Sequence, residues 1–274
     1  MEGEFLPLPA GRVEMKTPDT SKPAEQDSAG AIRLLEEISL NAWPAFETSL
    51  YDGWVIRFAD GFSRRSNSIV PLYPSQSDVL EKIRLCEATC RERGQKTIFK
   101  LTAASDPKEL DLILSDEGYR PEAETGVRTM PVRNADAAPA PNVQLQDELT
   151  EEWILALCTY NAYDPRHHET VRRLTRLIHP PRTFASIRLG GKIIACGLGV
   201  VRQGHLSFFD IVVDKDQRRH GFGKQIMAGI MDWGRRQTAE TAFLQVMANN
   251  PAAMAMYDGL GFREQYRYVY WVKD

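Results

Sequence analysis

A turn with the chemistry of a phosphate-binding site lies near residue 221. The apolar run 206–213 predicts a buried strand, and apolar residues at helical spacing after the turn predict an amphipathic helix. Gly221 and Gly223 stand at the junction, where glycine lets a bulky phosphate approach the backbone. The N–H groups of a first helical turn are unpaired and partly positive, which favours an anion. Basic side chains surround the same turn, namely Arg218, Arg219, His220 and Lys224.

The residues after this helix narrow the choice of phosphate ligand. Residues 242–247 predict a further strand, Asn250 begins a short helix, and Tyr257 precedes a Gly-Phe pair at 261–262. The junction is neither a dinucleotide-binding Gly-x-Gly-x-x-Gly nor a P-loop. Arg-x-x-Gly-x-Gly followed by Asn-x-x-Ala-x-x-x-Tyr-x-x-x-Gly-Phe resembles the Gcn5-related N-acetyltransferases (GNAT). The resemblance covers about the last 130 residues, a common length for one domain.

Each residue of these motifs also has an ordinary structural explanation. An arginine such as Arg218 is most often a surface charge, and Tyr257 alone would most often be a core tyrosine with a hydrogen-bonded hydroxyl. Packing does not require all of these residues in this order. Together they therefore favour the enzyme family.

The resemblance implies acetyl-CoA as co-substrate. The pyrophosphate would lie on the N–H groups from Arg219 to Lys224, and the pantetheine arm would pair with the backbone of residues 211–213 like an extra strand. Tyr257 would protonate the departing sulfur, since its hydroxyl stays neutral at physiological pH. The implied cofactor-binding residues are Ile211, Val212, Val213, Arg218, Arg219, His220, Gly221, Phe222, Gly223, Lys224, Asn250 and Ala253. No metal is expected.

The general base is open between two interpretations. Asp210 is the only acid on its predicted strand, and an acid in an apolar strand costs free energy unless it is paired or used. It could accept the proton of the amine, directly or through water, or it could be a structural carboxylate that bonds a backbone N–H. In the family, the loop and second helix commonly line the acceptor site. Candidate acceptor-binding residues there are Asp164, His167, His168 and Glu169.

The chain is predicted to contain two related halves. Residues 1–29 are a flexible tail, 30–133 a degenerate GNAT-like domain, 134–142 an Ala/Pro linker, and 143–274 the catalytic GNAT domain. The order strand–helix–strand–helix–strand recurs in both halves, which indicates an internal duplication. The turn 73–78 of the first half has no glycine and contains a proline, so it is not expected to bind a pyrophosphate. The tandem arrangement resembles that of the mycothiol synthases.

The predicted fold is α/β, with a mixed, mostly antiparallel central sheet flanked by helices. In the first half we expect helices at 31–40, 77–92 and 107–117 and strands at 51–58, 66–72, 97–101 and 127–132. Asp60-Gly61 predicts a hairpin and Ser77 a helix N-cap. In the second half we expect strands at 142–146, 183–189 and 192–202 and helices at 150–160 and 168–178. Gly190-Gly191 predicts a two-residue hairpin and Thr150 an N-cap.

Composition limits the class of protein. The 274 residues carry 34 basic and 37 acidic side chains, a net charge of −3, which argues against a nucleic-acid-binding protein. No apolar run approaches a membrane span, and no signal peptide is visible, so a cytoplasmic enzyme is expected. Four cysteines are too few for a disulfide framework, and Cys86 and Cys90 are interpreted as core residues.

The leading hypothesis is acetyl transfer to a primary amine of a small or mid-sized molecule, which includes an amine-bearing antibiotic or a self-made peptide natural product. The extra domain would wall off the acceptor cleft. A second hypothesis is acetylation of a protein at its N-terminus or at lysine, and a third is a CoA-binding module without catalysis. Tyr257 argues against the third, because pure binding does not need that hydroxyl. A monomer or a homodimer is compatible with the sequence.

Overall fold

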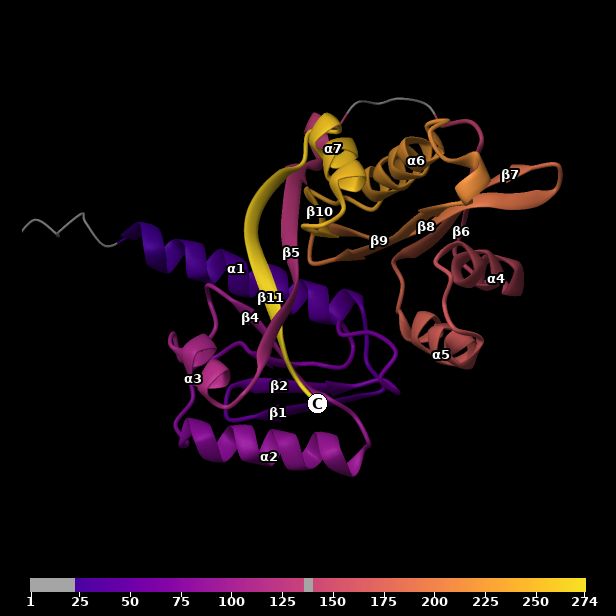
Figure 1. Ribbon diagram of the computed structural model, residues 1–274. Helices are drawn as coiled ribbons and strands as arrows, with labels where there is room; N and C mark the ends of the chain where they lie inside the picture. Colours follow the sequence, from indigo (N-terminus) through magenta and orange to yellow (C-terminus); the bar gives the residue numbers. More distant parts are fainter. Residues whose placement is uncertain (1–22, 136–139) are drawn as a thin grey trace, which may run out of the picture.

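The computed structural model describes residues 23–135 and 140–274, which form one eleven-stranded sheet covered by helices (Figure 1). The predicted tail falls largely on residues 1–22, outside the described residues. The first helix begins at Pro23 and not at residue 31. The elements of the first half are α1 (Pro23–Ala42), β1 (Glu47–Tyr51), β2 (Trp54–Phe58), β3 (Ile69–Pro71), α2 (Val79–Glu92), β4 (Thr97–Thr102), α3 (Leu110–Asp116), β5 (Arg120–Pro131) and η1 (Val132–Asn134).

The second half follows the predicted order closely. Its elements are β6 (Val143–Gln146), α4 (Glu151–Tyr160), η2 (Pro165–His167), α5 (His168–Leu177), β7 (Arg182–Leu189), β8 (Lys192–Arg202), β9 (His205–Val213), η3 (Lys215–Gln217), α6 (Phe222–Arg236), β10 (Thr241–Met247), α7 (Pro251–Gly259) and β11 (Arg263–Lys273). The glycine pair between β7 and β8 forms the predicted tight turn, with Leu189 opposite Lys192. The Thr150 side chain accepts a hydrogen bond from Trp153 N–H, which confirms the predicted cap.

Several boundaries in the first half differ from the prediction. The expected strand 51–58 contains the hairpin turn itself, at Asp52-Gly53, and only its second part forms β2. Asp60-Gly61 instead lies in the longer connection between β2 and β3, which do pair antiparallel. The N-cap of α2 is Asp78 and not Ser77, because the Asp78 carboxylate accepts from Glu81 N–H. The last strand begins at Arg120, seven residues before its predicted start at 127.

The sheet joins the two halves through exchanged strands. The strand order is β1-β2-β3-β4-β11-β5-β10-β9-β8-β7-β6. The C-terminal strand β11, which we did not predict, therefore lies between β4 and β5 of the first half, and β5 pairs with β10 of the second half. Figure 1 shows β5 and β11 running side by side through the middle of the molecule. Only the β3–β4 and β9–β10 pairs are parallel, so the predicted mixed, mostly antiparallel sheet is confirmed.

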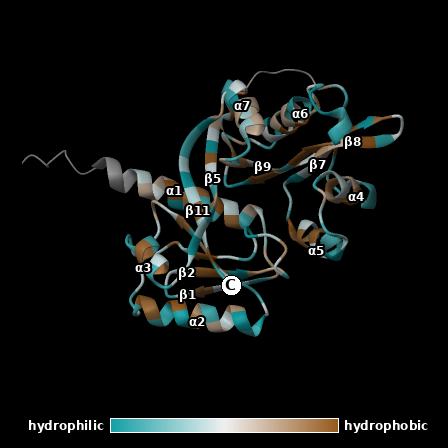
Figure 2. Cartoon of the chain, in the orientation of Figure 1, coloured by the Kyte–Doolittle hydropathy of each residue, from teal (hydrophilic) through white to brown (hydrophobic). Residues whose placement is uncertain are grey.

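The helices cover the sheet in layers. In the second half, α6 packs on β7, β8 and β9 through buried residues such as Ile226 and Ile230, while α4 packs on the opposite face through Trp153 and Leu157. Helix α1 lies along the central strands, where Ile38 is fully buried. In Figure 2, β2 and β9 are largely hydrophobic, β11 is largely hydrophilic, and helices such as α2 carry both kinds of residue. The described helices include none long and apolar enough to cross a membrane.

Candidate active site

Asp210 lies in a bulge of β9, where β9 pairs with β8. The register shifts by one residue between the pairs Leu198↔Phe209 and Cys196↔Val212, so β9 has one residue more than β8 here. Asp210 has a φ of 53°, in the left-handed region that costs a non-glycine residue about 1–2 kcal/mol. Such strained backbone persists where the surroundings enforce it, which often happens at functional sites.

The strands β9 and β10 separate just before the bulge. Their parallel pairing extends only from Thr241↔His205 to Phe243↔Ser207, although both strands continue for several residues. In the described part of the chain, residues 209–213 therefore have β8 on one edge and no strand on the other. That free edge is the geometry expected for pairing with an extended pantetheine arm, because backbone N–H and C=O groups need partners.

The predicted phosphate-binding turn has the expected conformation. Gly221 is the N-cap of α6, with a φ of 79°, and Arg219 before it is also left-handed at 68°. Gln225 N–H donates to the Gly221 carbonyl at 3.1 Å, which is the first hydrogen bond of the helix. The N–H groups of residues 222–224 therefore have no partner within the helix. A Cβ built on Gly221 would meet no atom within 4 Å. An open cradle of unpaired N–H groups fits the pyrophosphate of CoA.

The basic residues of the turn project outward around this cradle. Arg218, Arg219, His220 and Lys224 are all exposed. Arg218 Nε donates to the Val213 carbonyl at 3.4 Å. Asn250 caps α7, since its Oδ1 accepts from Ala253 N–H at 3.1 Å, which leaves its amide nitrogen for a ligand. These positions fit the cofactor-binding roles that the resemblance implies.

Tyr257 lies inside the core formed by α6, α7 and the sheet. Its side chain is 9% exposed, and its ring packs edge-on against Phe262 at a centroid distance of 6.1 Å. Burial raises the pKa of Tyr257 to about 12, so the hydroxyl keeps its proton at neutral pH. Within residues 23–135 and 140–274 that hydroxyl makes no hydrogen bond. A protonated, unengaged hydroxyl meets the chemical requirement for a general acid.

A cavity of about 240 Å³ opens at Asp210, between the two halves of the chain. The second half contributes Tyr163, Asp210 and Gln245, and the first contributes Trp43 and the segment 62–65. Burial raises the pKa of Asp210, and the nearby positive charge of Arg65 opposes that shift. A carboxylate with a raised pKa is a stronger base than an exposed aspartate, as proton acceptance from an amine requires.

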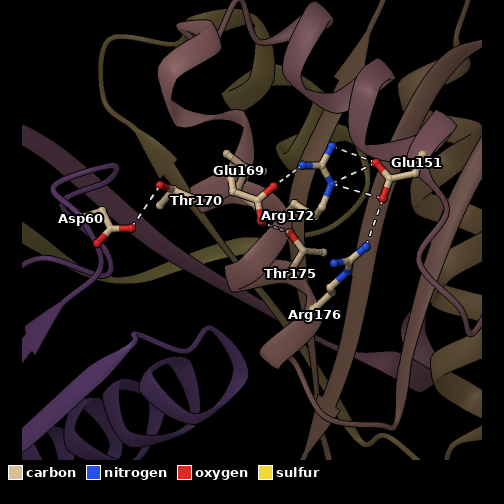
Figure 3. A network of polar contacts seen from close by, with 8 residues as sticks. Asp60, Glu151, Glu169, Thr170, Arg172, Thr175 and Arg176 are labelled. Carbon is tan, nitrogen blue, oxygen red and sulfur yellow. Dashed lines mark hydrogen bonds and ion pairs between the residues drawn. The ribbon is translucent and has the colours of Figure 1, made fainter.

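The first-half segment at the cavity is fixed by polar contacts. Asn67 Oδ1 accepts from Ala59 N–H and Gly61 N–H at 2.7 and 3.0 Å. Asp60 accepts a hydrogen bond from Thr170 of α5 at 3.3 Å and pairs with Arg173 at the same distance. Figure 3 shows the Asp60–Thr170 contact next to the ion-pair network of α5. The connection between β2 and β3 is therefore held against the second half.

The candidate acceptor-binding residues lie near the cavity but outside its lining. Asp164 is exposed and caps η2 by accepting from Arg166 N–H. His168 Nε2 lies 3.2 Å from the Tyr163 carbonyl oxygen, and Glu169 is ion-paired with an arginine of α5 (Figure 3). The His167 ring packs on Phe62, which lines the cavity.

The corresponding turn of the first half is filled by the chain's own carboxylate. Asp52, in the β1–β2 turn, accepts from Ser75 Oγ at 2.7 Å, Gln76 N–H at 3.0 Å and Ser77 N–H at 2.9 Å. These donors, led by Ser77 N–H, hold the pKa of Asp52 well below its usual range. The buried Lys82 ammonium lies 3.3 Å from the same carboxylate. These three donors of the turn are therefore occupied by Asp52.

Sequence reasoning missed Arg65, Tyr163 and Gln245 as cavity residues. Arg65 belongs to the first half, which was predicted to have lost only a cofactor site, and no local pattern connects it to Asp210. Gln245 gave a weak signal, as a polar residue inside the apolar strand β10. Its amide oxygen accepts a hydrogen bond from the Tyr268 hydroxyl at 3.0 Å, and its amide nitrogen donates one to Ser39 Oγ at 2.7 Å.

Comparison with known proteins identifies the family. A family model described as probable histone acetyltransferase Rv0428c C-terminal matches residues 29–271. The chain belongs to this family. It is a GNAT N-acetyltransferase, and that membership implies acetyl-CoA as co-substrate.

Burial of Cys86 and Cys90 agrees with their interpretation as core residues, and the described residues contain no cluster of metal-ligating side chains.

Two curated relatives and two solved structures resemble the chain. It is 27% identical to the uncharacterized N-acetyltransferase YobR of Bacillus subtilis, over 88% of this chain and 98% of that protein. A ribosomal protein bS18-alanine N-acetyltransferase of Escherichia coli is 35% identical over 27% of this chain and 50% of its own length. A GCN5-related N-acetyltransferase from Kribbella flavida has a TM-score of 0.64 at 14% identity, covering 91% and 95% of the two chains. A tandem GNAT protein from the clavulanic acid biosynthesis pathway has a TM-score of 0.58 at 11% identity, covering 90% and 95%. These structures share the fold.

Proposed function

We propose that this acetyltransferase moves the acetyl group of acetyl-CoA to a primary amine of a small or mid-sized molecule bound at Asp210. One observation carries the proposal. The only acid of β9 is held in a bulge, on the wall of a cavity, where β9 and β10 separate. An amine in that cavity would meet the thioester at the free strand edge.

Each residue would then have one task. When bound, acetyl-CoA supplies the acetyl group. The N–H groups of residues 222–224 would hold its phosphates, and the edge of β9 would orient its pantetheine arm. Asp210 would accept the proton of the amine, and Tyr257 would give a proton to the departing sulfur. Asp210 could act directly or through a water molecule.

A protein acceptor is the second candidate, because the family description names a probable histone acetyltransferase and one relative is named for a ribosomal protein. The cavity favours the first candidate. Trp43 and residues 62–65 bound it on the side of the first half, so a flat protein surface would not reach Asp210. A flexible peptide end could still enter.

The test is thiol release from acetyl-CoA with a panel of small amines, an N-terminal peptide and a lysine peptide. We expect release with at least one small amine and loss of that activity in Asp210→Asn. Asp232→Asn, an exposed change on α6, is the control and should retain activity. Release with peptides alone would favour the protein acceptor. Acetyl-CoA binding without release on any acceptor would favour a binding module.

A further inference from the structure

We infer that the acceptor carries an acidic group, a carboxylate or a phosphate, near its amine, and that Arg65 binds this group. The inference rests on the proposed function, because it concerns the acceptor of the same reaction. Asp210 and Arg65 line one cavity and carry opposite charges. An acceptor with its amine at Asp210 and its acidic group at Arg65 would match both.

Arg65 lacks an acidic partner within the described ranges. Its guanidinium takes part in no ion pair and no hydrogen bond there, and only its backbone carbonyl is engaged, by Arg57 Nη1 at 3.0 Å. The neighbouring Arg64 differs, since it is ion-paired with Glu122. A partly buried cation without a partner is costly unless a ligand satisfies it. The fork of N–H groups on arginine suits carboxylate and phosphate oxygens.

The guanidinium is held in place before any ligand arrives. Its carbon lies 5.1 Å from the ring centroid of Trp43 and 5.2 Å from that of Phe209. The Trp43 indole N–H donates to Ser66 Oγ at 2.9 Å, which fixes this ring against the same segment. Stacking leaves the edge of the guanidinium, with its N–H donors, available for an anion.

The other titratable groups that face the cavity do not neutralise Arg65 or Asp210. Arg64 is neutralised by Glu122, and burial raises the pKa of Tyr163 and of Tyr270, so both hydroxyls stay neutral. Arg65 and Asp210 influence each other electrostatically, but no nitrogen and oxygen of the two lie within 4.0 Å. A zwitterionic molecule can therefore lie between them.

The size of the cavity limits the acceptor. Its volume of about 240 Å³ lies below the roughly 300–1,000 Å³ of sites for drug-sized ligands. The aromatic lining from Trp43, Phe62 and Tyr163 would contact an apolar body. An amino-acid-sized molecule, or one end of a longer chain, fits these dimensions.

The experiment compares matched acceptors in wild type, Arg65→Gln and Arg65→Lys. Phenylalanine is paired with phenylalaninamide for the carboxylate, and phosphoethanolamine with ethanolamine for the phosphate. Amino acids from glycine to 6-aminohexanoate vary the distance between the amine and the acid. Arg236→Gln, an exposed arginine of α6, is the control. We expect Arg65→Gln to lower kcat/KM by roughly 10- to 100-fold for the acid-bearing member and little for its neutral partner. The phosphate and carboxylate pairs show which anion is bound.

Other outcomes overturn the inference. If wild type shows no preference for acid-bearing amines, or if Arg65→Gln lowers kcat/KM equally for both members of a pair, Arg65 does not bind the acceptor's acid. If wild type acetylates none of the amines, the proposed function fails separately. Calorimetry then decides the inference by itself: phenylalanine or phosphoethanolamine that binds wild type and not Arg65→Gln supports it, and absence of binding to wild type refutes it.

Discussion

The packing around Gly197 in β8 controls the position of Asp210, the candidate base. It lies opposite the bulge at Asp210, and a Cβ there would come 2.5 Å from Ile211 Cδ1 and 2.7 Å from Ile226 Cγ2. Carbon atoms in favourable contact are about 3.5–4.0 Å apart, so both groups would have to move by roughly 1 Å. Because Ile211 is next to Asp210, the Gly197→Ala change should displace the carboxylate.

The expected cost has two parts. Overpacking of a buried site costs about 1–3 kcal/mol, which for a chain of this size lowers Tm by about 2–10 °C. A displacement of about 1 Å at a reacting group can lower turnover by about 10²-fold. Gly199→Ala is the matched control. Its Cβ would lie 2.5 Å from Ile230 Cγ2, an equally close contact, but Gly199 pairs with Phe208, outside the bulge.

Thermal melting and turnover measured on the same preparations decide the matter. Both variants should melt below wild type, and only Gly197→Ala should lose turnover per folded molecule. If the two variants show the same turnover, the bulge does not position the base. If Gly197→Ala melts like wild type, the packing argument itself is wrong.

Three further changes test the other parts of the site. Tyr257→Phe should lower turnover roughly 10²–10⁴-fold with little change in acetyl-CoA affinity, and a variant that only melts lower would make Tyr257 structural. Gly221→Val should abolish acetyl-CoA binding in calorimetry, because it places a branched side chain in the open cradle and strains a left-handed residue; normal binding would move the phosphate site elsewhere. The acid limb of the kcat/KM profile should follow Asp210: burial raises its pKa, so activity should fall on acidification at a higher pH than the usual aspartate value, and a limb at or below that value would exclude Asp210 as the base.

The sequence predicted local structure wherever one short pattern determines it. The hairpin at Gly190-Gly191 and the cap at Thr150 each depend on a few adjacent residues. The strand β11 was missed although its buried residues alternate from Tyr266 to Val272, a clear strand period. Its neighbours could not be predicted from that pattern, because pairing with β4 joins residues more than 150 positions apart.

The sequence predicted the cofactor side of the candidate site and missed most of the acceptor side. The cofactor side lies within the single stretch from Ile211 in β9 to Ala253 in α7, so motif spacing along the sequence indicates it. The acceptor side is assembled by tertiary contacts: Arg65 and Asp210 line the same cavity, and Asp60 holds the segment that contains Arg65 against α5. The division of the chain into two domains at residues 134–142 stays a prediction.

The exchanged strands have a consequence for synthesis on the ribosome. The sheet of the first half cannot close until β11 (Arg263–Lys273) is available, and β11 is synthesised long after β4, with which it pairs. A nascent first half would expose the edge of β4 and the apolar surface under Tyr268 and Tyr270. We therefore expect the first half to acquire its native structure only after β11 has been synthesised, and removal of β11 to produce aggregation in both halves.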